Sequence, residues 1–367
     1  MRIVLMVLIG IHALIHFFGF FKAYGMTQFD AISKPISKPV GLIWIMAGIL
    51  LILSLILFAI KSQYWWTAAL LGVVVSQILI FAFWKDARFG TILNIVILIP
   101  AIFAFFGYAF QSKIADERAE MLETVSRKET SILSESDIRD LPEPVQKWIR
   151  KSGALGQEIV QTVYLEQDLE MQMKQGDEQW SKASANQIFT VSPPAFNWTV
   201  EMEMNPLVTI AGRDKFGQGK GEMLIKLFST FTMVNSKDSP RIDEATLQRY
   251  LAEIVWFPSA ATRSYIAWEE IDEYSARATM EYQGTIGSGT FHFDKEGNFK
   301  KFSAMRYKDA NSEEKLEWVV EAQKVEERNG IKIPIACEAR WKMDGEYWTW
   351  LRLRVMQIEF NPILHEE

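Results

Sequence analysis

Two histidines stand four residues apart in the first apolar run of the chain. On a helix, His12 and His16 fall one turn apart, so both imidazole rings face the same way. Such a pair could ligate haem or a metal ion, or relay protons. The alternative is interhelical hydrogen bonding to Ser76, Gln77 or Asn94. We predict no metal site and no cofactor, with haem or a metal at this pair as the competing hypothesis.

A second group of polar residues surrounds one amphipathic helix, predicted from an N-cap at Asp243 to about Trp256. Its apolar face must cover a sheet or plug an open barrel. Arg249 and Glu253 lie on its polar face, and Asp214 and Arg306 are expected nearby. The predicted ligand-binding residues are Trp198, Met202, Arg249, Tyr250, Glu253, Trp256, Phe257 and Arg306.

The chain carries no motif that identifies a reaction. It has no nucleophile elbow, zinc-ligand pattern or Walker sequence, and nothing pairs its many carboxylates. The single cysteine, Cys337, lies in a strand-like run without a histidine partner and is predicted to be a core thiol. We therefore name no catalytic residue and favour a protein that is not an enzyme.

Composition divides the 367 residues into two parts. The first ~110 residues are strongly apolar, and the rest has an ordinary composition. A net charge of −6 makes nucleic acid an unexpected partner. Nothing in the sequence decides the oligomeric state.

Four apolar runs of about 20 residues each match the length needed to cross a bilayer. They are Ile3–Tyr24, Val40–Ile60, Tyr64–Trp84 and Gly90–Phe110. Short linkers predict an up-down bundle over residues 1–110, with Gln77 and Asn94 as further intramembrane polar residues. The short Lys85–Arg88 segment is expected to be a charged loop.

The basic residues of the first and third loops (Lys22, Lys34, Lys38, Lys85 and Arg88) outnumber those on the opposite side (Arg2 and Lys61). This bias predicts that both termini lie outside the cytoplasm.

Residues 111–156 are predicted to be a helical connector, ending in a short capping helix with Val145, Trp148 and Ile149 on one face. From residue 157 to residue 367 the apolar period changes to two, and turn signals separate roughly ten strands. The expected fold is a four-span helical bundle followed by a mainly β domain. In that domain an antiparallel sheet of half-barrel type curls around one helix.

Three segments carry a resemblance to a family of uncharacterised bacterial membrane proteins with a C-terminal domain of unknown function. They are Leu141-Pro-Glu-Pro-Val-Gln-Lys-Trp-Ile-Arg150, Arg249-Tyr-Leu-Ala-Glu-Ile-Val-Trp-Phe-Pro-Ser-Ala260 and Ile331-Lys-Ile-Pro-Ile335. At the level of architecture, the β domain is similar to the half-barrels of lipoprotein-localisation carriers, which hold acyl chains. The helical half is similar, by its number of spans, to small DoxX-type membrane proteins. The resemblance implies no catalytic residues, because the family has none assigned.

These features favour an extracytoplasmic module anchored in the bacterial cytoplasmic membrane that binds a lipophilic or acylated ligand, such as a lipid or lipoprotein. Methionines and tryptophans on the dry strand faces would suit such a cavity, although they would equally suit a solid core. Two alternatives remain open. The protein could be a scaffold or sensor partner of other envelope proteins, or a redox or transport protein that uses His12 and His16.

Overall fold

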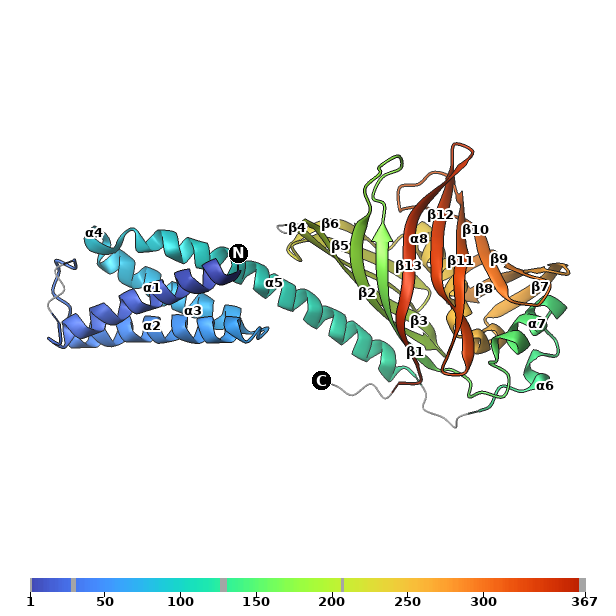
Figure 1. Cartoon of the computed structure of the whole chain (residues 1–367), viewed down its shortest axis with the longest axis horizontal. Helices are drawn as coiled ribbons and strands as arrows, with labels where there is room; N and C mark the ends of the chain where they lie inside the picture. The colour runs from blue at the N-terminus through green and yellow to red at the C-terminus, as the bar shows by residue number, and fades with distance from the viewer. Residues whose placement is uncertain (1, 28–30, 126–130, 206–207, 363–367) are drawn as a thin grey trace. The chain divides into compact units, whose positions relative to one another are not determined.

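The computed structural model describes residues 2–27, 31–125, 131–205 and 208–362. It divides into two compact units, Met1–Lys113 and Ile114–Glu367. Figure 1 shows the helices of the first unit and the sheet of the second.

The first unit is helical. Its elements are α1 (Arg2–Ala23), α2 (Lys38–Ala59), α3 (Trp65–Ala82), α4 (Trp84–Ala87) and the start of α5 (Gly90–Glu123). Four of these helices, α1, α2, α3 and α5, are long and apolar enough to cross a membrane, as predicted. The Lys85–Arg88 segment, expected to be a loop, lies largely in the single helical turn of α4. Close packing depends on small residues, because a Cβ atom on Gly19 would lie 2.1 Å from the Trp44 ring.

The second unit is built on a curled antiparallel sheet of thirteen strands, more than the ten or so expected. Short strands at the two edges, such as β6 and β7, alternate too weakly to be recognised from sequence. Along the sheet the order is β6-β5-β4-β3-β2-β1-β13-β12-β11-β10-β9-β8-β7. The strand bounds are β1 Thr162–Met171, β2 Ser181–Val191, β3 Pro194–Asn205, β4 Val208–Gly217, β5 Lys220–Leu227, β6 Phe231–Ser236, β7 Ile266–Asp272, β8 Ser275–Tyr282, β9 Thr285–Phe293, β10 Phe299–Arg306, β11 Leu316–Arg328, β12 Ile331–Met343 and β13 Glu346–Phe360.

One helix lies inside the curl of this sheet, as predicted. Helix α8 (Pro240–Glu253) packs against β4 and β5 near one edge and against β8, β9 and β10 near the other (Figure 1). Two 3-10 segments follow it, η1 (Ile254–Trp256) and η2 (Pro258–Thr262). The predicted start was wrong: the N-cap is Ser239, and buried Asp243 instead accepts hydrogen bonds from Gly221 N and Lys220 Nζ. The helix therefore bridges two distant parts of the sheet and closes the half-barrel.

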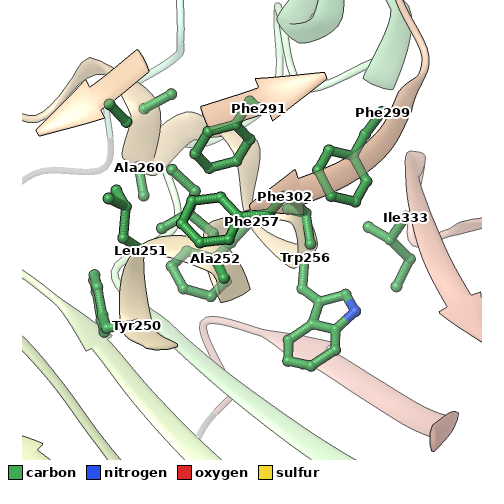
Figure 2. Close-up of a cluster of buried hydrophobic side chains, with 14 of the residues drawn as sticks. Tyr250, Leu251, Ala252, Trp256, Phe257, Ala260, Phe291, Phe299, Phe302 and Ile333 are labelled. Atoms are coloured by element: carbon green, nitrogen blue, oxygen red, sulfur yellow. The ribbon is translucent and has the colours of Figure 1, made fainter. Parts of the chain in front are cut away.

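The core lies where α8 and the two 3-10 segments meet the sheet (Figure 2). Tyr250, Leu251 and Phe257 have no exposed surface, and Trp256 has 3 %. The indole Nε1 of Trp256 donates to Pro334 O at 2.9 Å. This end of the half-barrel is a solid aromatic core.

Helices from the connector cover further parts of the sheet unit. After α6 (Glu135–Ile138), α7 (Glu143–Ser152) packs on β8, β12 and η2 and buries Val145, Trp148 and Ile149, as a capping helix should. Residues 114–123 of α5 lie on the outer face of the sheet, opposite α8. There Arg213, which is 2 % exposed, pairs with Glu117 at 3.1 Å.

Candidate ligand site on the inner face of the sheet

The inner face of the sheet is the face that meets α8, and strand alternation places several predicted residues on it. Gln187 of β2 lies opposite Trp198 of β3, and its side chain reaches Glu253 of α8. Arg306, at the end of β10, donates from Nε to the carbonyl oxygen of Ala245 in α8. Residues from distant parts of the chain therefore converge beside α8.

Arg249 is the centre of a charge cluster, which we define as Arg249, Asp214, Glu253 and Gln187. Its guanidinium binds Asp214 Oδ2 at 2.6 Å and Glu253 Oε1 at 2.9 Å. Gln187 Nε2 donates to Glu253 Oε2 at 2.8 Å. The same guanidinium lies 4.7 Å from the centre of the Trp198 ring, within cation–π range. The cluster ties α8 to β2 and β4 with its charges paired.

Burial perturbs the ionisation of this cluster. Burial raises the pKa of the Glu253 carboxyl above its ordinary value, although Arg249 opposes the shift. Burial also acts to lower the pKa of Arg249, but Glu253 and Asp214 raise it overall. Two buried acceptor atoms of the cluster, Gln187 Oε1 and Asp214 Oδ1, have no hydrogen-bond partner among the described residues.

Arg306 is the second inner-face cation, and its surroundings differ. Its guanidinium lies 4.6 Å from the Trp318 ring centre and 5.6 Å from the Trp341 ring centre. Among the described residues, no carboxylate stands within ion-pair distance of it. Burial lowers the pKa of Arg306 to about 10, because removal from water disfavours the charged guanidinium.

Beyond the solid core, the inner face carries side chains that are only half-buried. We call these the apolar strip: Trp198 on β3, Leu316 at the start of β11, Met343 at the end of β12, and Trp348 and Leu353 on β13. Each packs against the core on one side and keeps part of its surface open. Lys308 stands over the Trp348 ring at 5.0 Å. An apolar surface with cations at its margin can hold an amphiphilic molecule.

The predicted ligand-binding residues thus fall into three groups. Trp198, Arg249, Glu253 and Arg306 lie at or beside the apolar strip, whereas Met202 faces inward on β3 but is nearly fully buried. Tyr250, Trp256 and Phe257 belong to the core, where Tyr250 Oη donates to Thr190 O. Two site residues were not predicted from sequence: Gln187, because an isolated glutamine in a strand carries no pattern, and Lys308, because it follows the end of a strand.

A groove of about 1150 Å³ is lined by residues of both faces, including Leu353 of the apolar strip and Arg354 beside it. Its side chains form a row across the strands, in which Asp168 faces Ser184 and Arg354, and Glu201 faces Ala211. The inner-face residues between them, such as Leu169 and Cys337, are buried. The lining of this groove mixes charged residues with apolar ones such as Trp180, Met204 and Ile210.

The polar residues of the helical unit bond to one another. His12 Nε2 lies 2.8 Å from Asn94 Oδ1 and 3.1 Å from Ser76 Oγ, and Asn94 Nδ2 donates to Gln77 Oε1 at 3.0 Å. His16 Nδ1 donates to His12 O at 2.9 Å. This arrangement matches the hydrogen-bonding hypothesis. Within the described residues, no three potential metal-binding side chains gather at one place.

Comparisons with known proteins give a family and a distant structural likeness. The family of unknown function DUF6920 matches residues 139–360. The crystal structure of the LolA superfamily protein NE2245 from Nitrosomonas europaea aligns with 60% of this chain and 94% of its own, at 10% sequence identity and a TM-score of 0.32. No curated protein matches the chain.

Proposed function

This chain belongs to the family of unknown function DUF6920, and we propose that it is a non-catalytic, membrane-anchored module that binds a lipophilic or acylated ligand on the inner face of its sheet. The observation that carries the proposal is the apolar strip. Five large apolar side chains there pack against the core on one side, remain partly exposed and do not turn to the outer face.

The rest of the inner face explains why the strip would stay open. Helix α8 covers the part of the sheet near η1 and η2, where Tyr250 of α8, Trp256 of η1 and Phe257 fill the space. The strip lies on β3, β11, β12 and β13, whereas α8 packs mainly on β4, β5, β8, β9 and β10 and reaches the strip where Arg249 lies over Trp198. An acyl chain laid on the strip would bury apolar surface at about 25 cal/mol per Å².

The helical unit supplies the anchor in this proposal. Four helices of membrane-spanning length would keep the binding domain next to a lipid source. The basic bias of the first and third loops supports a bacterial cytoplasmic membrane with the binding domain outside the cytoplasm.

Two neighbouring residues on β13 provide a matched test. Leu353 lies in the apolar strip, and Arg354 points to the outer face beside it. In native mass spectrometry of the full chain, Leu353→Glu should lose a co-purified acyl ligand, because it places a charge on the strip. Arg354→Glu should retain the ligand. Equal retention by both variants, with unchanged melting temperatures, would argue against the inner-face site.

A further inference from the structure

We propose that the ligand of the apolar strip carries an anionic head, a carboxylate or a phosphate ester, and that Arg306 binds this head with Lys308 beside it. The inference rests on the proposed function, since it assumes that the strip holds an acyl chain.

The two inner-face arginines differ in their hydrogen-bond and ion-pair partners. Arg249 holds two carboxylates at 2.6 and 2.9 Å, so its charge is neutralised within the fold. Arg306 makes one described hydrogen bond, from Nε to the Ala245 carbonyl oxygen, and stacks on Trp318. A guanidinium has five N–H donors in a rigid fork, so the far side of this one is available for a bidentate anion.

The cost of burial supports the same conclusion. Removing a charge from water is unfavourable unless an opposite charge compensates for it. The tryptophans recover part of the cost through cation–π contact, but they do not neutralise the charge. Asp214 and Glu253 also act favourably on the Arg306 charge, but neither lies within ion-pair distance of it, so an anion bonded directly to Arg306 would add to their effect.

Lys308 gives a second, independent observation. Its ammonium stands 5.0 Å from the Trp348 ring centre and 3.9 Å from Met343 Sδ, next to two residues of the strip. Among the described residues it has no carboxylate within ion-pair distance, whereas nearby Lys315 is paired with Glu244 at 2.6 Å. Lys308 is exposed and Arg306 is half-buried. Two unpaired cations thus border the same apolar surface, as an acyl chain with an anionic head requires.

The test compares an acid with its neutral ester. The full chain is titrated in native mass spectrometry with cis-parinaric acid, its methyl ester and lysophosphatidic acid. Inorganic phosphate serves as the anion without a chain. We expect the two anionic amphiphiles to bind about tenfold more tightly than the ester, as for one charge-assisted hydrogen bond of ordinary strength. Phosphate alone should not bind measurably.

Variants identify the residue that binds the anionic head of the ligand. Arg306→Gln should abolish the preference for the acid while ester binding stays unchanged, and Arg306→Lys should keep part of it. Lys308→Gln should weaken the preference by about twofold, because exposed charges interact weakly. Lys342→Gln, which removes an exposed charge from the other face of β12, is the matched control and should change nothing.

The outcomes separate the two proposals. Equal binding of acid and ester by the unmutated chain, or a preference that survives Arg306→Gln, would overturn the anionic head and leave the apolar site standing. Binding of phosphate as tight as that of lysophosphatidic acid would also overturn the proposed anionic head, because the site would then bind a free anion without an acyl chain. Failure of every amphiphile to bind would refute the proposed function itself.

Discussion

At the scale of residues, the inner face places two kinds of aromatic side chain in different roles. Trp256 is enclosed, with its only polar atom bonded to Pro334 O. Trp198 and Trp348 keep part of their surface open. Residue type does not distinguish them, which is why the sequence predicted Trp256 and Trp198 alike as ligand-binding residues. Trp256 belongs to η1 and packs within the core, whereas Trp198 on β3 and Trp348 on β13 lie on the sheet at the margin of that core.

Trp256→Ala should therefore behave as a core truncation. We expect a loss of about 3–5 kcal/mol in the free energy of unfolding, because a large cavity would replace the indole. Chemical denaturation monitored by circular dichroism measures the loss. Tyr347→Ala, at a side chain that is 50% exposed, is the control and should change stability little. A small effect of Trp256→Ala would show that the surrounding space is not solidly packed.

Cys337 offers a residue-scale test of burial through its pKa. The thiol is 2 % exposed, and burial raises its pKa from 9.0 to about 12. Because the folded-state pKa is the higher one, this group's contribution to stability is complete below pH 9 and is lost as pH rises toward 12. At pH 8 the folded protein should not react with a thiol reagent, and denaturant should make Cys337 reactive. Rapid labelling without denaturant would contradict the burial of this thiol.

At the scale of elements, periodicity predicted the strands that have one dry face and the single helix inside the curl. The Val163–Leu169 and Ala276–Tyr282 patterns became β1 and β8. The polar face of α8 was less informative, because the curled sheet surrounds the helix. Gln248, on that face, is 2 % exposed and donates to two strand carbonyls. The pairing of Arg249 with Asp214 joins residues 35 positions apart, and no local pattern encodes it.

The end of α5 should stabilise the sheet through Glu117. Glu117→Gln would leave the buried Arg213 partly uncompensated, because only Glu222 would still pair with it. We expect the free energy of unfolding to fall by about 3 kcal/mol, the lower end of the range for a broken buried ion pair. Thermal and chemical unfolding of the sheet unit measure the loss. Glu143→Gln, which breaks the exposed pair with Lys147, is the control and should have little effect. Equal effects of the two variants would mean that the buried Glu117–Arg213 pair stabilises the sheet unit no more than the exposed Glu143–Lys147 pair does.

At the scale of the whole molecule, the chain joins four apolar helices to a closed half-barrel. The proposal gives each part a task, since the helices would hold the module at a membrane and the inner face would receive an amphiphile. Orientation follows from the charge bias alone, so it needs a direct test. A reporter fused after Glu367 should read as extracytoplasmic. A cytoplasmic reading would reverse the orientation and place the binding domain at the inner leaflet.

The most direct test of the central claim is photo-crosslinking of the full chain with a fatty acid that carries a diazirine in its acyl chain, followed by peptide mapping. The inner-face site predicts labelled peptides that contain Trp198, Met343, Trp348 or Leu353, in addition to any labelling of the four apolar helices. Leu353→Glu should remove the labels from the sheet and leave those on the helices. Labelling confined to the helices, with none on the inner face of the unmutated protein, would contradict the account.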